Sequence, residues 1–417
     1  MTHASNEGAF SESTAREGAA AQTPDEVLGE LGPLPRSVDA QGLQAERPEW
    51  GRLITLPVYM VAMVAGGVVV AWMGSVAIGV IIALLGVVPA IGVFLFANAR
   101  FPKIVGPRQK RPGAPDLGGI LGADEAILGE WAPTLIRDEV SVLEANRAKE
   151  VAATEAWLAG APAFERVEAT SADGTALVGH ACACASDSKR WVVLAHGYAG
   201  SWRDGLVHAR RYAEQGYNLL LVDMRAHGES AGAWVGLGWL DREDLVVWAA
   251  WLVGREGADV RVVFHGVGMG GAAALMASAE EGLPAQVRAV VADSAYADVW
   301  NVGVRLLTPG DGKSSPHPMI DIMRLALRLR AGGYDVALAK PEDAVSRAKV
   351  PVFLVQGDQD TLVPPYMATR LEEACGGAAA GDDHVLSLIE GAGHGEAALA
   401  DPVGYYWRLF TFLGRYL

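Results

Sequence analysis

The sequence predicts a mostly parallel, doubly wound α/β sheet of about eight strands, preceded by a two-helix transmembrane hairpin. Three observations lead to this prediction. Short apolar runs without polar alternation recur after about residue 160, and such runs are typical of strands buried on both faces. Helical stretches separate these runs, and strand–helix alternation favours a parallel sheet. Nearer the N-terminus, residues 53–99 contain no charged side chain.

The predicted sheet begins with a hairpin and continues through six apolar runs. The hairpin strands are Phe164–Thr170 and Ala176–Cys184, around a turn at 172–174. The six runs are Trp191–Ala195, Asn218–Val222, Val260–Phe264, Val287–Ala292, Val352–Gln356 and Val385–Ile389. Helices are expected at Arg242–Glu256, at Pro364–Cys375 and, leading into the domain, at 134–158.

Four segments follow from this pattern. Residues 1–51 are rich in small and acidic residues and predict a disordered acidic tail. Residues 52–99 form the hydrophobic segment, and 100–160 form a basic juxtamembrane linker and helix. Residues 161–417 form the predicted α/β domain.

The uncharged segment is too long for one membrane helix. A single helix of this length would measure about 70 Å, whereas the hydrocarbon core is about 30 Å thick. Two spans are therefore expected, near Leu53–Trp72 and Val76–Ala97, with a turn at 73–75. A buried helical hairpin of a soluble core is the alternative.

Basic residues flank the outer ends of this hairpin and are absent from its turn. They are Arg47 and Arg52 before it, and Arg100, Lys103, Arg108, Lys110 and Arg111 after it. Because positive residues stay on the cytoplasmic side, both ends are expected inside the cell. The sequence thus predicts a multi-pass protein of the cell membrane with a cytoplasmic C-terminal domain.

Composition excludes several functions. The chain has 34 Lys and Arg against 49 Asp and Glu, a net charge of −15, which argues against nucleic-acid binding because phosphate backbones require basic patches. The three cysteines, Cys182, Cys184 and Cys375, form no disulfide framework and are interpreted as reduced packing residues. No phosphate loop, metal cluster or dinucleotide fingerprint is evident, so no cofactor and no metal is expected.

Five glycine- and histidine-containing motifs end or follow the predicted strands, where functional groups of open α/β sheets gather. They are His196-Gly197-Tyr198-Ala199-Gly200, the segment 223–230, Gly266-Val267-Gly268-Met269-Gly270-Gly271, the segment 357–364, and Gly391-Ala392-Gly393-His394-Gly395.

In this order the motifs resemble the α/β-hydrolase superfamily, over about residues 160–417. Within it the chain is similar to the bacterial membrane-anchored serine-aminopeptidase-like and lysophospholipase-like branch. The resemblance implies that Asp360 is the catalytic acid and His394 the base. It implies that 266–270 is the nucleophile elbow, and that the backbone N–H groups of Tyr198 and Met269 form the oxyanion hole.

The same resemblance implies a substrate site around the loop before the oxyanion hole. His196 and Gly197 belong to that loop. The resemblance also implies a cap insertion at about 299–349, which adds Trp300 to the predicted substrate-binding residues. The side chain of Tyr198 is expected to be a wall of the acyl pocket.

The chain departs from the family pattern at the nucleophile. Gly268 stands where the family carries serine. Glycine accepts a positive φ without a Cβ penalty, so the fold should survive while covalent catalysis is lost. Losing the nucleophile costs roughly 10⁶ in turnover in a serine protease. Serines 201, 230, 278 and 294 belong to other loops or a helix.

Several site residues have a structural alternative. Asp360 and His394 could staple two loops together, and Asp358 is expected to cap its turn. Asp223 and Glu229 are assigned to a structural loop. In the cap, Arg324 and Arg328 share a helical face that would bind an anionic headgroup or lie in solvent.

Three functions remain open. The first is a membrane-tethered hydrolase relative that acts on small acyl esters, amides or lysolipid-like substrates. The second is a pseudoenzyme that uses the retained pocket for binding or scaffolding. The third is an active hydrolase in which Gly268 is an engineered or erroneous substitution. The expected ligand is small and acyl- or lipid-like, and the sequence does not identify whether or which proteins are partners.

Overall fold

The computed structural model describes residues 62–73, parts of 76–95, 106–109, 137–307, 324, 328, 335–376 and 383–417. An eight-stranded sheet with the order β10-β9-β8-β7-β4-β5-β3-β2 lies at its centre. Its strands are β2 (Glu165–Thr170), β3 (Ala176–Cys182), β4 (Arg190–Ala195), β5 (Asn218–Asp223), β7 (Arg261–Val267), β8 (Val287–Asp293), β9 (Val352–Gly357) and β10 (His384–Ile389).

The sheet is parallel except at one side. β3 runs antiparallel to both of its neighbours, β2 and β5. The pairs β4–β5, β4–β7, β7–β8, β8–β9 and β9–β10 are all parallel. This arrangement confirms the predicted mostly parallel sheet of about eight strands. As a consequence, the loops that carry the sequence motifs leave the sheet at one edge.

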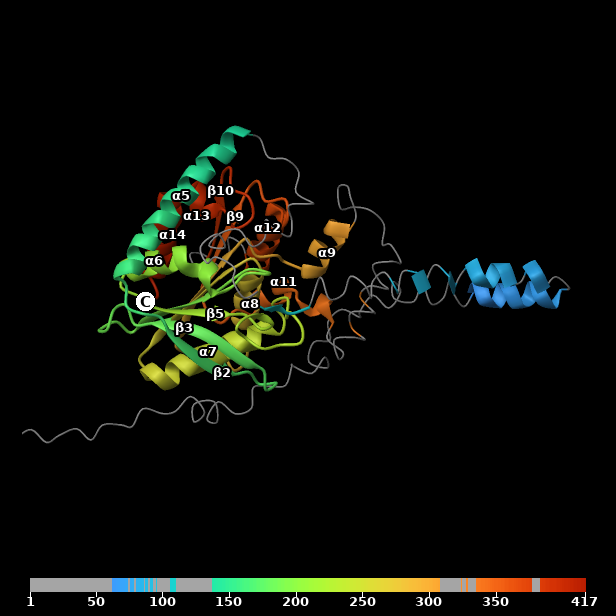
Figure 1. Cartoon of the computed structure of the whole chain (residues 1–417), viewed down its shortest axis with the longest axis horizontal. Coiled ribbons are helices and arrows are strands. Elements are labelled where there is room, and N and C mark those ends of the chain that lie inside the picture. Colours follow the sequence, from blue (N-terminus) through green and yellow to red (C-terminus); the bar gives the residue numbers. More distant parts are fainter. Residues whose placement is uncertain are drawn as a thin grey trace, which may run out of the picture.

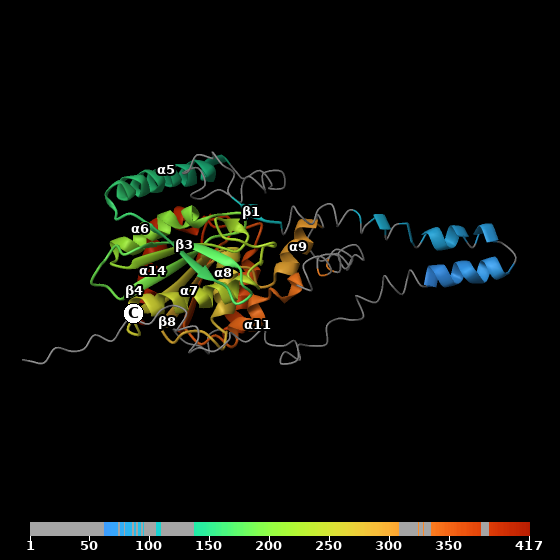
Figure 2. The ribbon, with the colours of Figure 1, turned by 60° about the horizontal axis from the view of Figure 1, so that its bottom comes forward.

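Helices cover both faces of the sheet (Figure 1). On one side lie α5 (Arg137–Gly160), α6 (Leu206–Glu214), α13 (Ala397–Ala400) and α14 (Pro402–Leu413). On the other lie α7 (Asp241–Glu256), α8 (Met269–Ala277) and α12 (Pro365–Ala374). Figure 2 shows α5 and α6 on one side of the sheet and α7 on the other.

Side chains alternate between the two faces of the sheet along β4, so this one strand packs against the helices on both faces. Val193 and Ala195 belong to the core cluster that includes α7 and α8, whereas Val192 and Leu194 belong to the cluster that includes α6 and α14. Successive strand side chains point to opposite faces. A strand buried on both sides must therefore be apolar throughout, which is the pattern that the sequence shows.

The cap region is described in part. α9 (Val299–Leu307) is followed by η2 (Val336–Leu338) and α11 (Pro341–Val345). The backbone N–H of Val299 donates to Ala339, and that of Glu342 donates to Ala297. These bonds tie both ends of the predicted insertion to the domain, while 308–323 and most of 325–334 lie outside the described residues.

A short parallel ladder was not anticipated from the sequence. β1 (Arg108–Gln109) pairs with β6 (His227–Gly228), so a piece of the predicted linker lies beside the loop that follows β5. η1 (Trp202–Gly205) precedes α6. The predicted 134–158 helix is confirmed as α5, which begins at Arg137 and ends at Gly160.

The N-terminal predictions fall largely outside the described residues, including the tail at 1–51. Of the two predicted spans, residues 62–72 are helical and so are stretches between 76 and 95. The two views show these two runs side by side (Figures 1 and 2). Within the described residues, no helix is both long enough and apolar enough to cross a membrane.

Candidate functional site

Gly268 lies at a sharp turn between β7 and α8. Its backbone angles are φ 54° and ψ −113°, and the helix begins at the next residue, Met269. The N–H of Gly268 donates to the carbonyl of Asp293 at 2.8 Å, which ties the turn to the end of β8. A residue with a side chain is strained at such a φ, so glycine is the residue that adopts this turn most easily.

The flanking glycines are required for a different reason, which is close approach of backbones. A Cβ on Gly266 would lie 2.1 Å from the carbonyl carbon of Gly270. A Cβ on Gly270 would lie 2.2 Å from the carbonyl oxygen of Ala195. Neither backbone atom can rotate away, so α8 packs against β7 and β4 only because both positions lack side chains.

His394 and Asp360 form a hydrogen-bonded pair. The ring Nδ1 of His394 lies 2.7 Å from Oδ2 of Asp360, and the Asp360 side chain is fully buried. The same carboxylate accepts from Nε2 of Gln356 at 2.9 Å and from the backbone N–H groups of Leu362 and Val363. These donors fix the carboxylate, and the carboxylate in turn fixes the imidazole.

The other ring nitrogen of His394 faces Gly268. A Cβ built on Gly268 would lie 3.1 Å from Nε2 and 3.7 Å from Cε1 of that ring. Because an ionised carboxylate only accepts, Nδ1 carries the proton and the neutral ring presents a proton acceptor at Nε2. The geometry is therefore that of a base directed at the space above the turn.

The loop that follows β4 lies across this space. The Cα of Gly197 would be 3.9 Å from a Cβ at position 268, so Tyr198, the next residue, adjoins the turn. Met269 occupies the first position of α8, where a backbone N–H has no partner within the helix and points toward anions. These two N–H groups are the predicted oxyanion donors.

Two buried histidines connect this loop to the loop after β5 through hydrogen bonds. Nε2 of His196 accepts from the N–H of Met224 at 3.0 Å, while Nδ1 lies 2.7 Å from the Gly197 carbonyl. Nε2 of His227 accepts from the N–H of Ala199 at 3.1 Å. Burial lowers the pKa of His196 to about 4, and burial together with His196 lowers the pKa of His227 to about 3.

This geometry corrects the substrate-binding role predicted for His196. Both of its ring nitrogens already contact the backbone, and the neutral ring that burial imposes suits one donor and one acceptor. His196 thus positions the loop instead of contacting a ligand. Sequence reasoning missed this because a His-Gly pair after a strand does not reveal where the ring points.

Arg108 lies near the site. The sequence indicated it only as one of the basic residues that follow the hydrophobic segment, and not as a site residue. Its guanidinium donates to the Tyr198 hydroxyl and lies 5.1 Å from the centre of the Tyr198 ring. β1 thereby connects the linker to the oxyanion loop. A two-residue strand leaves no periodic signal in a sequence, so this contact became visible only in the folded chain.

The loop after β5 has the structural role that the sequence predicted for it. The Asp223 carboxylate accepts from the N–H groups of Trp202 and Glu229. The Ser230 hydroxyl donates to the Asp223 carbonyl at 2.6 Å and accepts from the Val178 N–H at 2.8 Å. Neither side chain is directed at Gly268 by these contacts.

Ser294 contacts the residue that follows His394. It has a φ of 53°, and its hydroxyl donates to Asp293 at 2.8 Å and accepts from the Gly395 N–H at 3.0 Å. Burial raises the pKa of Asp293 to about 6. Ser294 therefore holds the residue after His394 in place.

The described cap residues contact one another. The backbone N–H of Trp300 donates to Oδ1 of Asp298 at 2.8 Å, and the centre of the Trp300 ring lies 6.0 Å from the Arg324 guanidinium. Arg324 makes a two-point ion pair with Asp335 at 2.7 and 2.9 Å. Arg324 was expected either to bind an anionic headgroup or to lie in solvent. The ion pair shows instead that its charge is neutralised within the protein. The role predicted for Trp300 at the substrate stays a prediction.

Asp358 caps a loop, as the sequence suggested, although the loop is a different one. Its Oδ1 accepts from the N–H of Gly391 at 2.8 Å. The bond joins the turn after β9 to the turn after β10, which carries His394. The acid position therefore belongs to Asp360, which is the residue that contacts the histidine.

The sheet has the strand order described above. The turn at Gly268 and the Asp360–His394 pair lie together at the carboxyl ends of its parallel strands. This arrangement is that of the α/β-hydrolase fold. A family described as X-Pro dipeptidyl-peptidase (S15 family) matches residues 139–312. The match includes the Gly268 turn and ends before Asp360 and His394.

Other relatives are more distant. The chain is 24% identical over 218 residues to the uncharacterized protein YqkD of Bacillus subtilis, which covers 50% of this chain and 69% of that protein. Among solved structures, esterase Pf2001 of Pyrococcus furiosus is 24% identical, with a TM-score of 0.49 over 61% of this chain and 91% of that one. TT1662 of Thermus thermophilus is 22% identical, with a TM-score of 0.43 over 60% and 98%.

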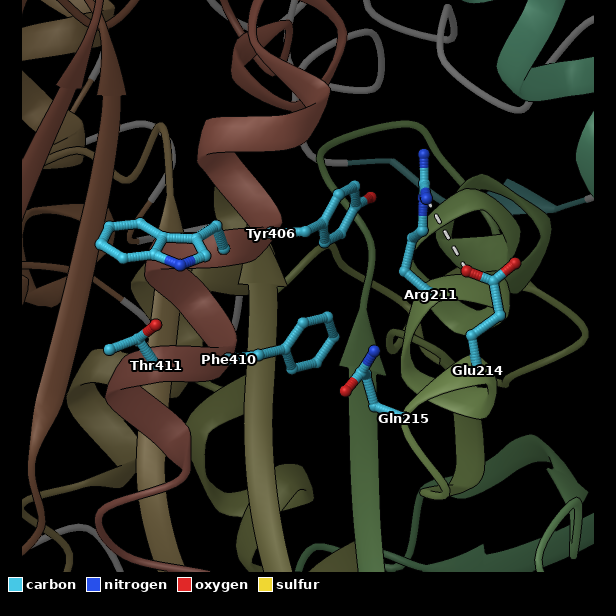
Figure 3. A pocket seen from close by; sticks show the side chains of 7 residues that line it. Arg211, Glu214, Gln215, Tyr406, Phe410 and Thr411 are labelled. Atoms are coloured by element: carbon cyan, nitrogen blue, oxygen red, sulfur yellow. Dashed lines mark ion pairs between the residues drawn. The ribbon is translucent and has the colours of Figure 1, made fainter.

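A surface hollow of about 420 Å³ lies away from this site, between α6 and α14 (Figure 3). It is lined by Arg211, Glu214, Gln215, Tyr406, Trp407, Phe410 and Thr411. The Arg211 guanidinium lies 5.0 Å from the centre of the Tyr406 ring. None of these residues belongs to the loops around Gly268, so the hollow is not the candidate site.

Proposed function

We propose that this chain is a catalytically weakened hydrolase that binds a small acyl ester, amide or lysolipid-like ligand above Gly268. Turnover, in this proposal, is confined to attack by water. The observation that carries it is the retained His394–Asp360 pair, whose outer ring nitrogen faces a turn without a hydroxyl. The match to a peptidase family over 139–312 supports an acyl-transfer ancestry.

In the proposed reaction, groups around the turn act together on the acyl carbonyl. Nε2 of His394 takes a proton from water as the water oxygen attacks the acyl carbonyl. The backbone N–H groups of Tyr198 and Met269 stabilise the oxyanion. When the intermediate collapses, the acyl–oxygen or acyl–nitrogen bond breaks and Nε2 returns the proton to the leaving group. Asp360 maintains the tautomer throughout.

The expected rate is low. Removing the nucleophile from a serine protease costs roughly 10⁶ in turnover, and the remaining donors still give about 10³–10⁴ over water. A fluorophosphonate probe requires a nucleophilic hydroxyl at the turn, and Gly268 supplies none. We therefore expect the chain to hydrolyse activated esters slowly and to remain unlabelled by the probe.

The decisive experiment restores the hydroxyl. The Gly268→Ser variant, in the full chain, is assayed with p-nitrophenyl acyl esters and a fluorophosphonate. Because the turn, its flanking glycines, the base and the acid are present, we expect the variant to gain probe labelling and an ester turnover at least about a thousandfold higher. Gly268→Ala is the matched control, since it introduces the same Cβ without a hydroxyl.

A second function, a binding or scaffolding domain without turnover, is favoured by the same missing hydroxyl. It predicts a different outcome. A well-folded Gly268→Ser variant that stays inert toward esters and probe would show that the pocket has diverged, and would reject the weakened hydrolase. Adding His394→Asn to Gly268→Ser should abolish any gain, which distinguishes triad chemistry from a contaminating esterase.

The proposal also includes attachment to the cell membrane through the segment Leu53–Ala97. Its support is the uncharged sequence and the basic residues at both of its ends. In this arrangement the hydrolase domain faces the cytoplasm and receives ligands from the inner membrane surface. Lysolipid-like acyl chains would suit that location.

A further inference from the structure

Three side chains from separate elements meet beside the loop after β5. They are His180 of β3, Asp223 at the end of β5 and Glu229 after β6. One ligand atom from each lies within 4.8 Å of the other two. Register explains the first pair, because Val178 is opposite Asp223 and His180 follows two residues later on the same face. The cluster was not anticipated from the sequence, because only the folded chain brings its members together from separate elements.

The imidazole of His180 lacks a hydrogen-bond partner where it faces the carboxylates. Its side chain is only 9% exposed, and its Nε2 makes no hydrogen bond. The Glu229 Oε1 atom lies 3.5 Å away, beyond a good N–H···O distance. The ring stacks on Trp202 with centres 4.1 Å apart, which fixes its direction. A buried polar atom without a partner is costly, so something else must satisfy it.

The charges around this nitrogen suit a cation. A carboxylate oxygen of Asp223 and one of Glu229 lie within 4.8 Å of a ring nitrogen of His180. The Nε2 atom of His180, which makes no hydrogen bond, can present a lone pair to an ion. Arg166 contacts Oε2 of Glu229 at 2.7 Å and is shared with Glu168, while Oε1 of Glu229 lies 3.5 Å from Nε2 of His180.

We propose that His180, Asp223 and Glu229 bind a divalent transition-metal ion of the zinc type, with water as a further ligand. One imidazole and two carboxylates are ligands that zinc accepts. Zinc bonds of about 2.1 Å in a tetrahedron separate neighbouring ligand atoms by about 3.4 Å. The 3.5 Å between Nε2 and Oε1 matches that separation, whereas it is long for a direct hydrogen bond.

The ion would have a structural role. Asp223 also accepts from the N–H groups of Trp202 and Glu229, and His227 in the same loop accepts from Ala199. A metal bound to Glu229 would tie this loop to β3 and β5, and through His227 it would steady the oxyanion loop. The site is independent of Gly268, so its test is also independent of the proposed hydrolysis.

The experiment measures metal binding to the full, untagged chain. The protein is first stripped of metal with a chelator. Binding of Zn²⁺ is then measured by calorimetry and by the metal content after gel filtration. Binding of Co²⁺ is measured by visible absorption. We expect one tight equivalent of Zn²⁺ and a Co²⁺ spectrum of nitrogen and oxygen ligands. The melting temperature of the parent should rise with Zn²⁺.

Variants identify the ligands. Glu229→Gln should weaken Zn²⁺ binding at least about tenfold and remove the thermal shift. Glu168→Gln is the matched control, because it also removes a carboxylate from Arg166 but lies outside the cluster. His180→Gln tests the nitrogen ligand. A Cys182→Ser/Cys184→Ser variant should bind Zn²⁺ as the parent does.

Three outcomes would overturn the proposal. The first is the absence of a stoichiometric Zn²⁺ equivalent in the parent chain. The second is a Glu229→Gln variant that binds Zn²⁺ as tightly as Glu168→Gln. The third is a Co²⁺ spectrum with thiolate bands that vanish in the serine variant, which would place the ion on Cys182 and Cys184, whose sulfurs lie 2.7 Å apart.

Discussion

At the scale of single residues, three glycines of one motif serve two different physical needs. Gly268 supplies a φ of 54° at the turn, whereas Gly266 and Gly270 allow backbones to approach each other. A side chain at 268 would meet a ring edge that can move slightly. Side chains at 266 or 270 would meet carbonyl groups that cannot move without displacing α8.

This distinction predicts unequal costs for the same substitution. Gly268→Ala should lower the stability by about 1–2 kcal/mol, the penalty for a Cβ at positive φ. Gly270→Ala should cost more than about 3 kcal/mol, because its Cβ would lie 2.2 Å from the Ala195 carbonyl oxygen. Thermal denaturation of both variants against the parent checks this order. Equal melting temperatures would contradict the steric account of Gly270.

The dyad shows how far residue-level reasoning reaches. The pairing of Asp360 with His394 is implied by the resemblance of the motifs to those of α/β-hydrolases, and Oδ2 of Asp360 lies 2.7 Å from Nδ1 of His394 in the folded chain. Gln356, which donates to the same carboxylate, could not be anticipated, because an amide at the end of an apolar strand has no distinguishing spacing. Supporting residues of this kind depend on side-chain direction, which a sequence does not specify.

At the scale of elements, the sheet was predictable because burial on both faces leaves a strong signal. Each of the eight strands lies within a few residues of its predicted run. β1 was not predictable, since Arg108 and Gln109 form a strand only where His227 and Gly228 happen to pair with them. Long, apolar elements therefore follow from the sequence, and short polar ladders follow from tertiary contacts.

β1 gives the oxyanion loop a contact that can be tested. Arg108→Ala removes the hydrogen bond to the Tyr198 hydroxyl and the contact with its ring. A hydrogen bond to a charged group contributes about 1.5–3 kcal/mol, so amide hydrogen exchange in 197–201 should become at least roughly tenfold faster. Hydrogen-exchange mass spectrometry measures this directly.

The control for that experiment is Arg255→Ala. Arg255 also lies 5.1 Å from an aromatic ring, that of Trp251, and donates to the Glu165 carboxylate. Its loss should leave exchange in 197–201 unchanged. If Arg108→Ala had no greater effect on that segment than Arg255→Ala, β1 would be a passive contact and would not order the loop.

At the scale of the whole molecule, the chain combines an α/β sheet, whose strands lie between residues 165 and 389, with an apolar segment. Residues 53–99 of that segment contain no charged side chain. Exposed apolar side chains such as Val68, Trp72, Ile81 and Leu85 occur in its described part. Large apolar surfaces in water are unfavourable, and the proposed membrane attachment would bury them.

The proposed membrane attachment can be tested by cell fractionation and by protease accessibility. We expect the full chain to sediment with membranes, to resist extraction by high salt or alkaline carbonate, and to require detergent for release, because two apolar segments of about 20 residues match the hydrocarbon thickness. A tag placed before residue 1 should be accessible to protease only after the cells are opened, since basic residues at both ends favour the cytoplasmic side. A variant with Leu84→Arg and Leu85→Arg should weaken insertion, as charged residues in the hydrocarbon are costly. Release of the parent chain by salt alone would indicate a peripheral attachment, and a tag accessible on intact cells would reverse the topology.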